Sequence, residues 1–255
     1  MVRGLELFKT FFRNHSDKYL LIGGAACDVL FSAAGLPFRA TKDLDIVLIV
    51  EALDPEFIKR FWAFVKNGEY QVQQKSKSRK KYYRFLKPKH EDYPFQLELF
   101  ARNPDLLDLR EGAHLTPIPV NEELSSLSAI LIDDDYYSFI LEKSRMVEGV
   151  HLATPEALVC LKVRAFLDMR RLKAEGVKID DRDIRKHRND VVRLTALLTE
   201  RSSLSLTESI KRDMEEFLSV LQTERPDVKA IAKNMGLPPF DLKTIVAQIR
   251  QTFSL

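Results

Sequence analysis

Two carboxylates separated by a single residue, Asp43 and Asp45, are the clearest candidates for chemistry in this sequence. They begin an aliphatic, partly β-branched run, which predicts a buried strand over residues 44–50. Residues two apart on a strand face the same side, so Leu44 and Ile46 face the core while the carboxylates lie together. Because like charges at this spacing repel, the pair favours a bound cation, and Mg²⁺ or Mn²⁺ fits such oxygen ligands. The alternative is a capped, solvated turn at the strand end.

A pair of glycines, Gly23 and Gly24, precedes these aspartates, between a predicted apolar strand over residues 19–22 and a small-residue helix from about residue 25 to 34. Backbone N–H groups at a helix N-terminus can approach phosphates closely, and the helix dipole favours the negative charge. We therefore expect the backbone at both glycines to approach a triphosphate closely. Lys42, directly before Asp43, is a further candidate nucleotide-binding residue.

The elements that must position these residues alternate along the first part of the chain. Apolar patterns predict helices over residues 5–12 and 55–65, the second with Asp54 as N-cap and Pro55 at its first position. Its apolar residues, Phe57, Ile58, Phe61, Phe64 and Val65, form one stripe. Further strands are predicted over residues 70–73, 82–86 and 95–100, and a β-hairpin over 129–132 and 137–141. This order predicts an α+β fold with a mixed β-sheet and flanking helices.

After Thr154-Pro155 the pattern is helical almost throughout, with Thr154 expected as the N-cap of the first helix. Helices are predicted over residues 155–173, 180–200, 205–222, 226–234 and 241–253. The sequence thus predicts a C-terminal helical bundle over residues 153–255, behind a catalytic domain over residues 1–152.

Composition limits the class of protein. Hydrophobic residues make up 45% of the chain, charged residues 30%, and the net charge is +3. The longest apolar run contains Asp45, so we expect no membrane span, and the amphipathic N-terminal segment does not resemble a signal peptide. Cys27 and Cys160 lie far apart in apolar runs and are expected to be buried thiols in a reducing compartment. These features favour a cytoplasmic protein.

The order of apolar strand, Gly-Gly, helix and Asp-x-Asp on the next strand resembles the nucleotidyltransferase superfamily of the DNA polymerase β type. Residues 38–46, FRATKDLDI, are similar to its toxin-like branches. The resemblance implies a nucleotidyltransferase-like fold, an NTP substrate and Mg²⁺ or Mn²⁺ held by Asp43 and Asp45. It also implies a third carboxylate on a later strand. Glu98 is the best match, as metal ligand or proton acceptor. The alternative for Glu98 is the polar face of an exposed strand.

A second region resembles the AbiEii family, the toxin half of type IV toxin–antitoxin systems. The segment TPEALVCLKVRA at residues 154–165 is followed by KHRNDVVRL at residues 186–194. By this resemblance Lys162 would bind nucleotide phosphates, and Asp190 would orient Lys162 or the substrate. His187 stands where the family often has an acid, which is a departure. The alternative is a surface lysine and an ordinary helix-face aspartate.

A basic run, residues 75–89, contains eight basic residues and no acidic ones, with aromatic residues interleaved. Such a segment could follow an RNA backbone and stack a base, although it is also typical of a solvated hairpin loop. Basic residues on the later helices, Arg164, Arg170, Arg171, Lys186 and Arg188, would add positive charge.

The sequence therefore predicts a nucleotidyltransferase that moves an NMP from an NTP to an acceptor hydroxyl, with a toxin-like enzyme acting on tRNA as the favoured subtype. An antitoxin protein is a possible partner. A small-molecule acceptor such as an antibiotic is the alternative for the enzyme. A second hypothesis is a non-catalytic nucleotide-binding regulatory protein, to which Glu98 and His187 point. A phosphodiester hydrolase is a third, but His187 is not followed by Asp as its signature requires.

Overall fold

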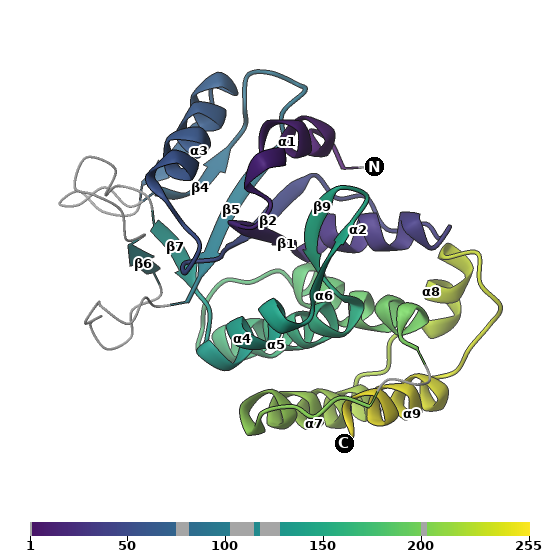
Figure 1. Cartoon of the computed structure of the whole chain (residues 1–255). Helices are drawn as coiled ribbons and strands as arrows, with labels where there is room; N and C mark the ends of the chain where they lie inside the picture. The colour runs from purple at the N-terminus through teal and green to yellow at the C-terminus, as the bar shows by residue number, and fades with distance from the viewer. Residues whose placement is uncertain (1, 75–81, 103–114, 118–127, 200–202) are drawn as a thin grey trace. The chain divides into compact units, whose positions relative to one another are not determined.

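The computed structural model describes residues 2–74, 82–102, 115–117, 128–199 and 203–255 (Figure 1). The chain divides into two compact units, of which unit 1 comprises Met1–Val29 and Arg39–Ala153. Unit 2 comprises Leu30–Phe38 and Thr154–Leu255. The domains predicted from the sequence, 1–152 and 153–255, differ from these units mainly because residues 30–38 belong to unit 2.

Within the described residues of unit 1, nine strands form one sheet. Its main order is β3-β4-β5-β2-β1-β9-β8, and β7 pairs with both β5 and β6. β2 pairs antiparallel with β1 and parallel with β5, so the sheet is mixed. The α+β class, a mixed sheet with flanking helices, is therefore confirmed. The strands are β1 (Tyr19–Ile22), β2 (Asp43–Leu48), β3 (Gln71–Gln74), β4 (Tyr82–Leu86), β5 (Gln96–Ala101), β6 (Leu115–Pro117), β7 (Ser128–Leu131), β8 (Ser144–Val147) and β9 (Val150–Ala153).

An aromatic core joins the helices of unit 1 to the sheet. α1 (Leu5–Phe11), followed by the 3₁₀ turn η1 (Arg13–His15), lies beside α3 (Pro55–Asn67) in Figure 1. The rings of Phe8 and Phe64 lie 5.6 Å apart at 87°, an edge-to-face arrangement. The stripe expected on α3 is buried at all its positions, and Asp54 Oδ1 accepts a hydrogen bond from the backbone N–H of Phe57 at 2.8 Å, as the cap prediction requires.

The hairpin predicted over residues 129–132 and 137–141 is wrong in its second half, which is α4 (Asp134–Glu142). Asp133 Oδ1 accepts a hydrogen bond from the backbone N–H of Asp135 at 3.0 Å, as an N-cap does. The acidic residues of the first turn interact favourably with the positive end of the helix dipole. The buried residues of α4 are Tyr136, Tyr137, Phe139 and Ile140, which is helical spacing.

The hairpin lies instead between β8 and β9. Its turn residues Glu148 and Gly149 have φ values of 49° and 77°. Positive φ at both turn positions is what a tight two-residue hairpin requires, which explains how the chain reverses here.

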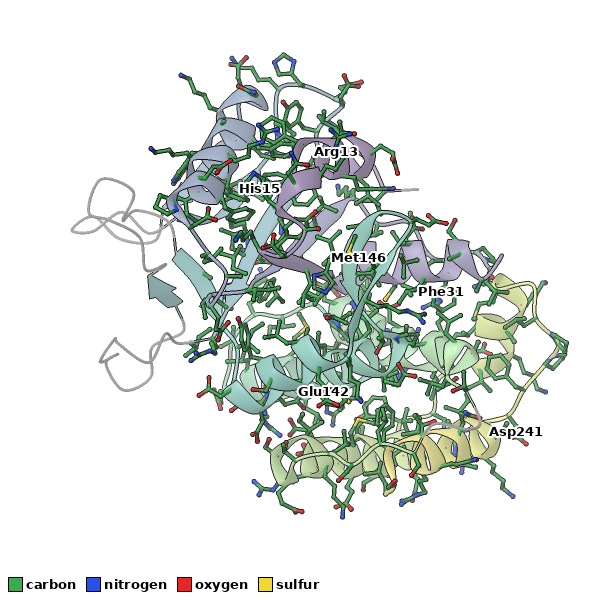
Figure 2. The ribbon with its side chains drawn as sticks, in the orientation of Figure 1. Arg13, His15, Phe31, Glu142, Met146 and Asp241 are labelled. Atoms are coloured by element: carbon green, nitrogen blue, oxygen red, sulfur yellow. The ribbon has the colours of Figure 1, made fainter. Side chains whose placement is uncertain are left out.

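The described residues of unit 2 are mainly helical. Its helices are the end of α2 (Gly23–Ala33), α5 (Pro155–Ala174), α6 (Asp181–Leu194), η3 (Thr195–Leu197, a 3₁₀ turn), α7 (Glu208–Thr223), α8 (Val228–Asn234) and α9 (Leu242–Phe253). Asp180 caps α6 through its carboxylate, and Asp241, which is labelled in Figure 2, caps α9 in the same way. Thr154 occupies the N-cap position of α5 as expected, but its hydroxyl makes no capping bond, which corrects that detail.

Two expectations on composition can be compared with this fold. Among the helices that the structure describes, none is both long and apolar enough to cross a bilayer. Cys27 and Cys160 are buried free thiols, as expected. Burial raises the pKa of the Cys160 thiol, so this side chain behaves as a small apolar group.

Candidate active site

The aspartates of β2 share one face of the strand. Leu44 and Ile46 are fully buried on the opposite face, while Asp43 and Asp45 are half-buried. β2 lies between β1 and β5 in the sheet. The alternation expected from the sequence is therefore present, and the two carboxylates stand on an internal strand.

Asp45 lies directly against the first residue of α2. Gly23 has a φ of +67°, and a Cβ added to it would lie 1.8 Å from Asp45 Oδ2. The backbone pairing of Ile22 with Asp45 between β1 and β2 sets this approach. Only glycine satisfies both the left-handed backbone and the missing space. Asp45 is thereby held at the positive end of the α2 dipole.

Gly24 has a comparable neighbour, because a Cβ added to it would lie 2.4 Å from Thr41 Oγ1. The space beside each glycine is thus filled by a side chain of the chain itself, Asp45 for Gly23 and Thr41 for Gly24. Sequence reasoning identified the glycines but missed Thr41. Its position two residues before Asp43 was the available signal.

Lys42 is exposed and close to both the aspartates and β5. Its Nζ lies 3.9 Å from the ring centroid of Phe95, a cation–π contact. Its backbone carbonyl accepts a hydrogen bond from the N–H of Phe95 at 3.1 Å. The side chain is therefore placed beside the site but is anchored on an aromatic ring.

The fit of a divalent cation can be judged from Asp43. No donor among the described residues reaches its buried Oδ1. A buried acceptor that lacks a hydrogen bond is costly unless a cation or water satisfies it, so this atom suits a metal ion. In the described part of the chain, no three His, Cys, Asp or Glu side chains converge as a metal site. The unsatisfied Oδ1 of Asp43 fits an ion of the Mg²⁺ type, which commonly takes one or two carboxylates together with phosphate oxygens and water.

Glu98 on β5 is the direct cross-strand neighbour of Asp45. It is also the neighbour of Arg84 on β4, whose Nε donates to Glu98 Oε1 at 2.7 Å and whose Nη2 contacts the same oxygen. The sheet thus brings Glu98 next to the aspartates, as the sequence suggested, but one of its oxygens is bound to Arg84. Sequence reasoning placed Arg84 only in the basic run, because a cross-strand partner has no local signal.

Lys162 and Asp190 lie together within unit 2. Lys162 Nζ is 3.6 Å from Asp190 Oδ2, and the two side chains are 7% and 0% exposed. Arg193 Nη1 donates to Asp190 Oδ1 at 3.2 Å, one helical turn along α6. The two residues are therefore not the surface lysine and helix-face aspartate of the alternative interpretation. They form a buried ion pair between α5 and α6.

The basic run is only partly described, because residues 75–81 lie outside the described residues. In the remainder, Arg84 pairs with Glu98 and Lys89 with Glu69. The expected contact with RNA stays a prediction.

No protein-family model and no curated protein matches the sequence. Among solved structures, the chain is similar to the Megavirus polyadenylate synthase, with 12% identity, a TM-score of 0.36 and coverage of 89% of this chain. The chain spans only 38% of that protein's length.

Two structures from Helicobacter pylori are also similar. One, described as a nucleotidyltransferase, has 15% identity and a TM-score of 0.32, over 96% of this chain and 89% of the other. The second, JHP933, has 17% identity and a TM-score of 0.33, over 96% and 87%. Similarity at these values does not assign a family or an activity to the chain.

Proposed function

We propose that this chain is a metal-dependent nucleotidyltransferase, which moves an NMP from an NTP to an acceptor hydroxyl and releases pyrophosphate. The observation that carries the proposal is the position of Asp43 and Asp45 on one face of β2, with Asp45 against the first residue of α2. This arrangement combines anionic ligands for a cation with the N-terminus of a helix, which favours phosphate.

Each candidate site residue in unit 1 has a proposed role. Asp43 and Asp45 hold a Mg²⁺ or Mn²⁺ ion, which when bound neutralises charge on the triphosphate and on the transferring phosphorus. The N–H groups of the first turn of α2, which begins at Gly23 and Gly24, bind phosphate oxygens. Lys42 adds positive charge beside them.

The acceptor oxygen attacks the α-phosphorus, the bond to the pyrophosphate oxygen breaks, and the acceptor's proton leaves. Glu98 accepts this proton or contributes to the metal site, since it neighbours Asp45 across the sheet. For this role Arg84 must leave Glu98 Oε2 available, or release the carboxylate when substrate binds.

The roles of Lys162 and Asp190 rest on the resemblance of their segments to the AbiEii family. Lys162 binds nucleotide phosphates, and Asp190 orients it, which agrees with their 3.6 Å separation. From the same resemblance we propose a toxin-like enzyme, with tRNA as acceptor and an antitoxin as partner. A small-molecule acceptor is the alternative substrate.

One observation favours a second function, that of a nucleotide-binding protein without transferase activity. Arg84 already contacts Glu98, the residue proposed to accept the proton. If that pair is permanent, the site binds a metal–NTP complex without a base for the acceptor.

The test is transfer of label from each α-³²P-labelled NTP, with Mg²⁺, to a pool of tRNA and cell extract. Asp43→Asn and Asp45→Asn are compared with Asp92→Asn, an exposed aspartate of unit 1. Labelling by the unmodified protein and Asp92→Asn, but not by the two site variants, supports the proposal. Binding of Mg²⁺–NTP without labelling favours the second function, and failure of both contradicts the site assignment.

A further inference from the structure

A basic groove lies within unit 2, between α5, α6 and the residues that follow α7. It is open to solvent and has a volume of about 590 Å³. Five cationic side chains line it: Arg170, Lys173, Arg185, Arg188 and Arg225. α5 and α6 lie side by side (Figure 1), and residues of both helices line the groove.

The carboxylates of the groove are too few to neutralise these cations. Glu224 accepts from Arg170 at 2.5 Å, and Asp181 accepts from Lys173 at 2.5 Å. Among the described residues, no ion pair includes the three remaining arginines, Arg185, Arg188 and Arg225. The groove therefore carries an excess of positive charge.

Arg188 shows the effect of this excess. Its Nη1 donates to the backbone carbonyl of Glu224 at 2.9 Å, whereas no acceptor among the described residues reaches its buried Nε. Burial lowers the pKa of Arg188, with further lowering by Arg185 and Arg170, although Glu224 acts in the opposite direction. A guanidinium in such surroundings is stabilised by an incoming anion.

The neighbouring cations of α5 differ from those of the groove. Arg164 is bonded to Asp168 and Asp213, and Arg171 to Glu216, at 2.9 Å in each case. Their charge is balanced within the protein, so the excess is a property of the groove and not of the helix as a whole.

The cations are arranged in rows. Arg170 and Lys173 are three residues apart on α5, and Arg185 and Arg188 are three apart on α6. This spacing is about 4.5 Å along each helix axis. Charges spread in rows suit an extended chain of phosphates better than one compact phosphate, which a converging nest of N–H groups would bind.

We propose that this groove binds the phosphodiester backbone of a polynucleotide. The two large apolar residues of the groove, Phe166 and Ile184, are 1% and 7% exposed, so they offer no free ring face on which a base could stack. The contact is therefore electrostatic and tolerant of sequence. If the proposed transferase is correct, the groove holds its RNA acceptor, but the binding itself does not require transfer.

The test is fluorescence polarisation of a labelled mixed-sequence RNA of about 12 nucleotides, titrated with the whole chain at several salt concentrations. No NTP or metal is added, so failure here is separate from failure of nucleotidyl transfer. Each phosphate contact contributes about 0.7 to the slope of log K against log salt. We expect Arg185→Ala and Arg225→Ala each to weaken binding and to reduce the slope by about 0.7.

The control is Arg212→Ala, which removes an exposed arginine of α7 that does not line the groove. We expect it to bind like the unmodified chain. Both target arginines are exposed as well, so thermal melting should show all three variants folded. Equal weakening by Arg212→Ala, or no binding of the RNA, would overturn the proposal. The proposal would also be overturned if inorganic phosphate or a free nucleotide displaced the RNA at concentrations near the Kd for RNA. That result would favour a small phosphate ligand.

Discussion

The carboxylate of Asp45 occupies the space that a side chain on Gly23 would need: a Cβ at Gly23 would lie 1.8 Å from Asp45 Oδ2. The two residues are far apart in sequence, but Gly23 directly follows Ile22, which pairs with Asp45 in the β1–β2 ladder. The glycine therefore determines where the carboxylate can stand, and substitutions at Gly23 should be felt at the proposed metal site.

We predict that Gly23→Ala abolishes nucleotidyl transfer, because the new methyl group must displace Asp45. It should also destabilise the protein, since a left-handed conformation costs a non-glycine residue about 1–2 kcal/mol before any clash. Label transfer and urea unfolding measure the two effects.

Gly35→Ala is the matched control. Gly35 has a φ of +71°, but an added Cβ would meet nothing within 4 Å. It should lose a similar free energy of unfolding from its backbone and keep full activity. If Gly23→Ala were as active as Gly35→Ala, Asp45 would not be held in the way described.

Glu98 allows a second prediction. Glu98→Gln keeps the shape of the side chain but cannot accept a proton, so we expect transfer to slow by about 100-fold or more. Binding of Mg²⁺–NTP, followed by calorimetry, should persist if the residue acts as the base, and should weaken if it is a metal ligand.

The comparison for Glu98 is Arg84→Ala, which removes its partner on β4. We expect a loss of about 1–3 kcal/mol in the free energy of unfolding, because a largely buried carboxylate loses its bond. Unchanged transfer in Glu98→Gln, together with equal destabilisation in both variants, would reduce Glu98 to a structural partner of Arg84.

Much of the fold was predictable because its signals are local. The cap at Asp54 and the stripe on α3 follow from spacing over a few residues, and both are present. The error at residues 137–141 has the same origin. A short apolar run fits a strand or a helix equally well. Asp133, which caps the helix, was assigned to the turn of the predicted hairpin.

The site was predictable only in part. Alternation along β2 placed Asp43 and Asp45 on one face without knowledge of the fold. The pairings Asp45–Glu98 and Arg84–Glu98 depend on strand register, and the approach of Thr41 to Gly24 depends on how a loop meets a helix. Such relationships join distant segments and leave no pattern in a single sequence.

The buried pair in unit 2 gives a third prediction. Lys162→Met removes one partner of the fully buried Asp190 but leaves Arg193, so we expect a loss of about 1–3 kcal/mol in the free energy of unfolding. Adding Asp190→Asn should restore part of it, since the buried carboxylate is then replaced by a neutral amide whose oxygen can still accept from Arg193.

Kinetics separate structure from nucleotide binding at Lys162. If Lys162 contacts the nucleotide, KM for NTP should rise in both the single and the double variant, because neither restores the cation. A double variant that recovers stability and KM together would show that the pair is purely structural.

The N-cap of α3 gives a prediction about acid stability. The backbone N–H of Phe57, and next the Lys18 side chain, hold the pKa of Asp54 below its ordinary value. Because the folded pKa lies below the unfolded value of about 3.9, this stabilisation is present above that pH and is lost as the pH falls through the folded pKa. Asp54→Ala should cost about 1 kcal/mol at neutral pH.

Asp54→Asn is the control for this titration, because asparagine caps a helix as well as aspartate but carries no titrating group. Urea unfolding at neutral pH and at about pH 3 should show a smaller loss on acidification for Asp54→Asn than for the unmodified protein. Equal losses would mean that Asp54 does not contribute to acid sensitivity.

The most direct test of the central claim is a crystal structure with Mn²⁺ and a non-hydrolysable NTP analogue, read from the anomalous signal of the metal. We predict a peak about 2.0–2.3 Å from carboxylate oxygens of both Asp43 and Asp45, with analogue phosphate oxygens completing the coordination. A metal–analogue complex bound elsewhere, with Asp43 and Asp45 not coordinating the metal, would contradict the account.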